Sequence, residues 1–215
     1  SVLEFIERDA IDWTLKYSDV EMQIHDDVKA HLLVEVDGND MELLYKDCEK
    51  IAEVMEGFEC GEILLADSES QKEQLWKLRR TVGEAVKANS VYKEEDTVVP
   101  RAELPKLLNG VKEIGNKYGF KSVCYGHAGD GNLHVNIIKG KMSEEDWNNK
   151  LTFGIREIFE LTKSLKGTIS GEHGIGFVQK DYLDIVLSDK NIELQKGIKN
   201  LFDPNAILNP GKIFA

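Results

Sequence analysis

Long apolar runs, signal-peptide features and paired cysteines are all missing from this sequence. No stretch approaches the roughly 18 consecutive apolar residues that a membrane-spanning helix requires. The N-terminus carries acidic residues where a signal peptide would be basic and then apolar. The three cysteines, Cys48, Cys60 and Cys124, are an odd number at no metal-like spacing, which fits a reducing compartment better than a disulfide framework. We therefore expect a cytoplasmic protein, peripheral to the inner membrane only through partners.

Acidic residues outnumber basic ones, and the common nucleotide-binding motifs are absent. The chain has 27 Lys and Arg against 39 Asp and Glu, a net charge of −12. This balance argues against binding to nucleic acid or to anionic membranes, because both require a basic surface. The sequence contains no GxGxxG, GxxxxGK(S/T) or GxSxG, so it has no readable dinucleotide cradle, phosphate loop or nucleophile elbow. A small anionic ligand would need local cations.

Hydrophobic periodicity predicts strands that alternate with helices. With 41% hydrophobic and 31% charged residues, the chain can bury a packed core. Three strand-like runs are each followed by apolar residues at helical intervals. The predicted strands are AHLLVEVDG, GEILLAD and EEDTVVPR, and the helices that follow span about 41–55, 75–86 and 104–119. Further helices are predicted over 2–17, from Ser143 to near Gly167, and around 192–201.

Two more β-rich runs, SVCYGH and NLHVNII, flank the sequence AGDG. Asp-Gly is a strong signal for a tight turn, so these runs are predicted to pair as an antiparallel hairpin. The whole pattern indicates an α+β fold, with helices packed on a largely antiparallel sheet and a short helical C-terminal tail. Only four prolines and no Ser/Gly run predict one unit over residues 1–215, with a soft divide near residue 110.

The predicted hairpin carries the densest group of polar side chains. If its turn centres on Gly129-Asp130, strand alternation places four polar residues on one face: His127, Asn132, His134 and Asn136. Two imidazoles and two amides are unusual on a core face or a solvent face, so the pattern indicates a polar cleft. A shift of one residue in register would separate the two histidines. Two incidental histidines near a turn are the alternative.

A second polar group lies in SGEHGIG, where Glu172 and His173 have glycine on both sides. Such glycines permit close approach of the backbone to a ligand. Two histidines and a carboxylate form a common ligand set for a catalytic divalent metal, and Glu172 would supply the carboxylate. The spacing matches no short zinc motif such as HExxH, and a capping glutamate beside a turn histidine is the alternative.

Two basic side chains are candidates for binding an anion. Arg79 falls within the apolar stripe of its helix, whereas Arg80 points about 100° away. An arginine on a buried face needs a partner, either an internal carboxylate or a substrate carboxylate in a cleft. Lys93, just before the acidic run EED, could bind the same anion or simply neutralise its neighbours.

Three ordered motifs, GHAGDGNLHVN, GEHGIGFVQK and FDPNAILNPGKIF, resemble the C-terminal half of the FAD-linked oxidases that act on D-2-hydroxy acids. This group includes the glycolate oxidase flavin subunit, D-lactate dehydrogenase and D-2-hydroxyglutarate dehydrogenase. The segments LVEVDG, LWKLRR and EEDTVVPRAELP also look like that family, so the resemblance covers nearly the whole chain. It implies a fold of two ferredoxin-like subdomains.

Carried over by motif position, the resemblance makes His127, His134 and Glu172 ligands of a divalent metal such as Zn, Mn or Fe. It makes His173 the catalytic base. Oxidation of a 2-hydroxy acid requires removal of the hydroxyl proton as hydride leaves Cα. A metal at the hydroxyl lowers its pKa, and a neutral imidazole nearby can take the proton.

The resemblance also assigns residues to the substrate and the cofactor. Arg79 and Lys93 would clamp the substrate carboxylate, and Asn136 would lie near the substrate. Gly174 and Asn209, in the second and third motifs, become candidates for FAD binding. A bidentate arginine would contribute orientation of the reacting carbon rather than bond making.

Family members carry a preceding FAD-binding domain, which we expect to be absent from these 215 residues. The resemblance therefore implies half of an enzyme that oxidises a small anionic D-2-hydroxy acid to a 2-oxo acid by hydride transfer to FAD. Its partner would be its own FAD-binding domain or a split flavin subunit, and the isolated chain would be inactive. The sequence leaves open whether the protein forms a homodimer. The alternative from another class is a free-standing metal-binding or regulatory module, or a small metallohydrolase, that uses the His/His/Glu set without flavin.

Overall fold

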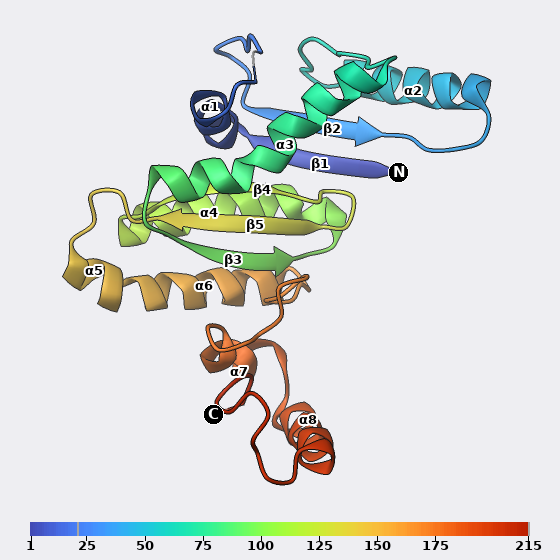
Figure 1. Ribbon diagram of the computed structural model, residues 1–215. Coiled ribbons are helices and arrows are strands. Elements are labelled where there is room, and N and C mark those ends of the chain that lie inside the picture. The colour runs from blue at the N-terminus through green and yellow to red at the C-terminus, as the bar shows by residue number, and fades with distance from the viewer. Residues whose placement is uncertain (21, 215) are drawn as a thin grey trace. The chain divides into compact units, whose positions relative to one another are not determined.

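The computed structural model describes residues 1–20 and 22–214, shown as a ribbon in Figure 1. The chain divides into two compact units. Unit 1 comprises Ser1–Tyr92 and Val123–Gly129, and unit 2 comprises Lys93–Ser122 and the described residues from Asp130 onward. Residue 110, near which the sequence suggested a divide, lies inside a helix of unit 2.

Unit 1 is built on strands β1 (Val2–Glu7) and β2 (Ala30–Glu35). They pair antiparallel over their full lengths, from Val2 opposite Glu35 to Glu7 opposite Ala30. The other edge of β1 pairs antiparallel with strand β4 (Lys121–Gly126), where Phe5 lies opposite Gly126 and Ile6 opposite Tyr125. The strand order within unit 1 is therefore β2-β1-β4.

Two sequence predictions in unit 1 are wrong. The opening segment is helical only over α1 (Arg8–Tyr17), because Val2–Glu7 forms ladder hydrogen bonds in a sheet instead. The predicted strand GEILLAD has no regular structure, and more than half of the surface of Ile63, Leu64 and Leu65 is exposed. An apolar run pairs as a strand only where a neighbouring strand offers its edge.

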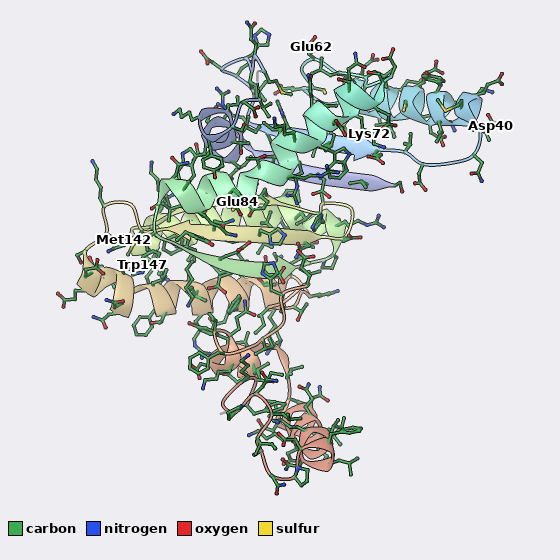
Figure 2. The ribbon with its side chains drawn as sticks, in the orientation of Figure 1. Asp40, Glu62, Lys72, Glu84, Met142 and Trp147 are labelled. Atoms are coloured by element: carbon green, nitrogen blue, oxygen red, sulfur yellow. The ribbon has the colours of Figure 1, made fainter. Side chains whose placement is uncertain are left out.

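The remaining helices of unit 1 begin at polar caps and confirm the predicted elements. Asp40, labelled in Figure 2, precedes α2 (Met41–Glu56). Its side chain accepts hydrogen bonds from two backbone N–H groups in the first turn of that helix. Ser68 caps α3 (Glu69–Asn89) by accepting from Gln71 N–H. Helix α3 packs against α1, and the core contains Ile6, Ala10, Ile11, Leu78, Val82, Ala85 and Val86.

Unit 2 contains all but the first residue of β3 (Tyr92–Val98), and the neighbour of this strand, β5 (Asn132–Ile138). Thr97 Oγ1 donates to Leu133 O, and Val99 N donates to Gly131 O. Residue numbers therefore rise along β3 while they fall along β5. The pair is therefore antiparallel. A single antiparallel bridge, Val98 to Thr168, extends it on the other side of β3.

Helices α4 (Leu104–Tyr118) and α6 (Leu151–Ser164) pack against each other in unit 2. The predicted stop of α4 is confirmed, because Gly119 adopts φ +81°, a left-handed conformation that glycine accepts without strain. The long helix predicted from Ser143 is divided at Lys150 into α5 (Glu144–Asn149) and α6. The core contains Leu107, Val111, Ile114, Leu133, Val135, Ile137, Ile155, Ile158, Phe159 and Ile169.

The C-terminal part of unit 2 contains α7 (Leu183–Val186) and α8 (Asp189–Phe202), with short 3-10 turns at Arg101–Glu103 and Lys180–Tyr182. Helix α8 extends the helix predicted around 192–201 by a few residues at its N-terminal end, where Ser188 caps it. The α+β class is confirmed. Within the described chain, no helix has the length and apolar character needed to cross a membrane.

Candidate active site

Strand β5 carries polar side chains at alternate positions, Asn132, His134 and Asn136, and all three are buried. The apolar residues between them are core residues, so the alternation predicted for this strand is confirmed. Asn136 is only 1% exposed, and its Nδ2 has no hydrogen-bond partner among residues 1–20 and 22–214. Because an unpaired buried donor costs about 1–3 kcal/mol, a ligand oxygen at this amide would be favoured.

His134 lies between two carboxylates of unit 2. Its Nε2 is 3.2 Å from Oε1 of Glu172, and its Nδ1 is 3.4 Å from Oε1 of Glu94. The ring of His173 stacks on that of His134, with centroids 5.2 Å apart, and its Nε2 is 3.8 Å from the same oxygen of Glu172. We call Glu94, His134, Glu172 and His173 the His134 cluster.

The His134 cluster contains the nitrogen and oxygen donor types that divalent metals bind. Nitrogen and oxygen ligands about 2.0–2.1 Å from a tetrahedral zinc are roughly 3.3 Å from one another. One ligand atom each from Glu94, His134 and His173 can be chosen so that all lie within 4.8 Å of one another. A carboxylate at the second nitrogen of a ligating histidine is also the usual way in which its tautomer is fixed.

Asp96 holds the loop that carries Glu172 and His173. It lies on β3, two residues after Glu94, and its Oδ2 accepts hydrogen bonds from the backbone N–H groups of Glu172 and His173. Burial by itself would raise the pKa of Asp96, but these N–H groups and the amide of Asn132 outweigh it and hold the pKa below its usual value. Asp96 therefore stays a carboxylate.

Lys93 and Glu95 occupy alternate positions on β3. Lys93 Nζ lies 3.8 Å from Oε1 of Glu95, so the structure pairs Lys93 with a neighbouring carboxylate, one of the two roles considered from sequence. Glu95 is fully buried, and Gln179 Nε2 donates to its Oε2 at 3.1 Å. Burial raises the pKa of Glu95 to about 7, although Lys93 and Gln179 oppose the rise.

In unit 1, the buried carboxylate of Glu4 contacts two residues that the sequence predicted for the site, Arg79 and His127. Arg79 Nε donates to Oε2 of Glu4 at 2.7 Å, and His127 Nδ1 lies 2.7 Å from Oε1 of the same side chain. The guanidinium also lies over the ring of Tyr125, 5.2 Å from its centroid. Within the described residues, Arg79 makes no hydrogen bond through its two terminal nitrogens, so these can still form a fork for a carboxylate.

The sequence profile described as "FAD linked oxidases, C-terminal domain" matches residues 1–213 of this chain. The chain belongs to this family. The resemblance of its three motifs to the FAD-linked oxidases of D-2-hydroxy acids is thereby confirmed.

Curated relatives of this FAD-linked oxidase domain cover nearly its full length. It is 33% identical to D-lactate dehydrogenase of Anaerostipes hadrus over 216 residues, 98% of this chain and 46% of that protein. It is 34% identical to D-2-hydroxyglutarate dehydrogenase of Stutzerimonas stutzeri over 224 residues, 100% of this chain and 47% of that protein. The glycolate oxidase subunit GlcD of Bacillus subtilis is 36% identical over 190 residues, 87% and 40% of the two chains. The chain thus spans about half the length of these relatives.

Solved structures share the fold of this domain. The 4-ethylphenol oxidase from Gulosibacter chungangensis aligns with 99% of this chain and 47% of its own, with a TM-score of 0.62 and 11% identity. The p-cresol methylhydroxylase structure aligns with 99% and 46%, with a TM-score of 0.59 and 14% identity. At these identities the likeness concerns the fold alone.

The two residues assigned to the cofactor differ in their settings within the FAD-linked oxidase domain. Gly174 adopts φ +74°, and a Cβ placed on it would meet no atom of the described chain within 4 Å, so a ligand can approach the backbone there. Asn209 is exposed, and its Oδ1 accepts from Lys212 Nζ at 3.1 Å. Asp203 orders the preceding segment, because its carboxylate accepts the N–H groups of Ile207 and Leu208.

Three carboxylates that contact predicted site residues or their loop within one unit or the other escaped sequence analysis. Glu94 and Asp96 were visible only as an acidic run, although strand alternation places both on one side of β3. Glu4 lies in a segment that was predicted to be helical, and 75 residues separate it from Arg79. The arginine on the buried face of its helix indicates that a carboxylate partner exists, but it does not indicate which residue that partner is.

Proposed function

We propose that this chain is the substrate- and metal-binding half of a flavin-dependent enzyme that oxidises a D-2-hydroxy acid to the 2-oxo acid. Membership of the FAD-linked oxidases supports this, and so do the names of three relatives, which act as D-lactate dehydrogenase, D-2-hydroxyglutarate dehydrogenase and a glycolate oxidase subunit. The membership does not favour a free-standing metal module or metallohydrolase. The partner proposed for this half is an FAD-binding domain or flavin subunit.

The observation that carries the proposal is the position of Glu172 within the His134 cluster. Its Oε1 lies 3.2 Å from His134 Nε2, although 38 positions of sequence numbering separate the two residues. His134 and Glu172 would hold a divalent metal, with Glu94 at the other nitrogen of the imidazole. The metal, when bound, would lower the pKa of the substrate hydroxyl.

His173 is the proposed base. Its side chain is half exposed and stacks on His134, so a substrate hydroxyl bound at the cluster would lie within reach of an imidazole that can take its proton. FAD, when bound, supplies the acceptor for the hydride that leaves the substrate Cα. Gly174 offers an open backbone beside the base, which suits close approach of a cofactor.

Each unit, taken by itself, contains donors that suit the substrate carboxylate. Arg79 is fixed at Nε by Glu4 and keeps two terminal nitrogens for a bidentate contact. Asn136 offers a buried amide, and Lys93 offers an ammonium that is already shared with Glu95. His127, which meets Glu4 through Nδ1, would bind a metal through Nε2, as histidines held in this way commonly do.

Anaerobic mixing of the full flavin-loaded protein with 2-hydroxy acids tests the proposal. D-lactate, D-2-hydroxyglutarate and glycolate are the first substrates to compare, each against an L-enantiomer where one exists. Bleaching of the oxidised flavin absorbance by at least one of them, with the 2-oxo acid as product, is the expected result. A protein whose flavin is reduced by none of these acids, with or without added Zn²⁺ or Mn²⁺, would contradict the proposal.

A further inference from the structure

We infer that Asp96 is a positioning residue of this site, whose carboxylate sets Glu172 and His173 beside His134. The inference rests on the proposed function, because it concerns the same His134 cluster. Asp96 itself does not reach the substrate in this assignment. It acts through the backbone of the loop that carries the metal ligand and the base.

One oxygen of Asp96 accepts three consecutive backbone N–H groups. Its Oδ2 lies 2.9 Å from Gly171 N, 2.7 Å from Glu172 N and 2.8 Å from His173 N. Three successive amides can converge on one atom only when the backbone curls around it. The conformation of residues 171–173 is therefore set by the position of a single carboxylate oxygen.

The other oxygen of Asp96 joins the loop to β5. Asn132 Nδ2 donates to Oδ1 of Asp96 at 2.5 Å and to Thr97 O at 3.2 Å. Asn132 lies two residues before His134 on the same strand, so its side chain shares that face of β5. Asp96 thus links three segments that contribute to the cluster: β3, β5 and the loop.

Side-chain packing cannot replace this link. The side chains of Glu172 and His173 are 52% and 46% exposed, so their contacts with His134 leave much of their surface unpacked. Asp96 is 1% exposed, and a buried carboxylate is retained only when its hydrogen bonds repay its desolvation. We therefore attribute the orientation of Glu172 and His173 to the backbone that Asp96 holds.

Gly171 shows how closely the loop follows Asp96. A Cβ at this position would lie 2.9 Å from Asp96 Oδ1 and 2.6 Å from Val98 Cγ2, and it would also overlap Asn132 Nδ2. Any larger residue would push the loop away from β3. The loop can be detached from either side, by changing Asp96 or by changing Gly171.

The first test is Asp96→Asn in the full protein. An asparagine that turns its oxygen to the loop sets its NH₂ against the NH₂ of Asn132, and the opposite orientation sets its NH₂ against three N–H donors. Amide hydrogen exchange at residues 171–173 should become at least about tenfold faster. After removal of any bound metal, Zn²⁺ affinity measured by calorimetry should fall roughly 10- to 100-fold, as for other residues that support metal ligands.

Glu95→Gln is the matched control, because it neutralises the adjacent buried carboxylate on the same strand. Glu95 contacts Gln179 and Lys93 rather than the loop, so both exchange and Zn²⁺ affinity should stay within about twofold of wild type. Gly171→Ala, which leaves Asp96 intact, should reproduce the Asp96→Asn result. It also provides the test if Asp96→Asn fails to fold.

Unchanged exchange at residues 171–173 in both Asp96→Asn and Gly171→Ala would overturn the inference. Equal losses in Glu95→Gln would also overturn it, because the effect would then belong to any buried charge on β3. A wild-type protein that binds no divalent ion would contradict the metal part of the proposed function instead. In that case the exchange measurement alone decides whether Asp96 holds the loop.

Discussion

Arg79 Nε lies 2.7 Å from Oε2 of Glu4, and both side chains are largely buried, 11% and 5% exposed. Burial of an ion pair stabilises a fold little, since desolvation offsets most of the attraction. The pair does, however, fix the plane of the guanidinium. An arginine held at Nε presents its two terminal nitrogens in one direction, which is the geometry that a carboxylate ligand requires.

Arg79→Ala should therefore raise KM for the 2-hydroxy acid roughly 10- to 100-fold, with a smaller loss in kcat. A charge-assisted hydrogen bond is worth about 1.5–3 kcal/mol and acts in the ground state and the transition state alike. Arg80→Ala is the matched control on the same helix, because Arg80 is exposed and stacks on Trp76. Steady-state kinetics should leave its KM unchanged. Comparable KM values in the two variants would remove Arg79 from the binding site.

His173→Ala should lower kcat by roughly 10²- to 10⁴-fold with KM little changed, because a general base contributes when the proton leaves. His25, an exposed histidine of unit 1, provides the control, and His25→Ala should retain wild-type kinetics. The measurement is the rate of flavin reduction between pH 6 and pH 9. If His173→Ala keeps a near-normal rate over that range, Glu172 or a metal-bound hydroxide becomes the better candidate for the base.

His134→Ala should weaken metal retention, because it removes the imidazole that lies between Glu94 and Glu172. Its activity should recover in part when excess Zn²⁺ or Mn²⁺ is added, whereas that of His173→Ala should not. After dialysis, the metal content measured by atomic absorption should be lower in His134→Ala than in His173→Ala. Recovery of His173→Ala by added metal would instead make His173 a ligand, as its place in the His134 cluster also permits.

Glu95→Gln should stabilise the protein above pH 7. Burial raises the folded-state pKa of Glu95 from its ordinary 4.5 to about 7, so the folded state binds more protons than the unfolded state between these values. The free energy of unfolding therefore falls as pH rises from 4.5 to 7, by about 3 kcal/mol for this group. Glutamine does not ionise, so the variant does not undergo this fall in the free energy of unfolding.

Urea unfolding at pH 5 and at pH 8 tests this prediction. The gain of Glu95→Gln over wild type should be larger at pH 8. Glu62→Gln, at an exposed position labelled in Figure 2, should show no such difference. An equal gain at both pH values would mean that Glu95 is already ionised in the folded protein at pH 5.

The polar face of β5 was predictable because strand alternation is a local property. Asn132, His134 and Asn136 follow a period of two, and that period survives any arrangement of the neighbouring strands. The capped helices α2, α3 and α4 were predictable for the same reason, since Asp40, Ser68 and Gly119 act within one turn.

Long-range pairing set the limits of the sequence analysis. Val2–Glu7 contains residues suited to a helix or a strand, and its antiparallel partner, Ala30–Glu35, decides between them. Glu4 meets His127 across 123 positions, and Asp96 meets the loop across 75 to 77. Such contacts leave no periodic trace in the sequence, so the burial and partners of these carboxylates could not be predicted from it.

The interrupted course of unit 1 has a consequence for biosynthesis. Its first 92 residues need Val123–Gly129, which supply strand β4 for β1, the Cys124 N–H for Glu7 and the imidazole of His127 for Glu4. A ribosome that adds about 5–20 residues per second delivers this strand only after the intervening segment of unit 2 has been made. Until then, two carboxylates of β1 await their partners and one edge of that strand stays open. The nascent chain therefore offers a chaperone an unpaired strand edge for several seconds of every round of translation.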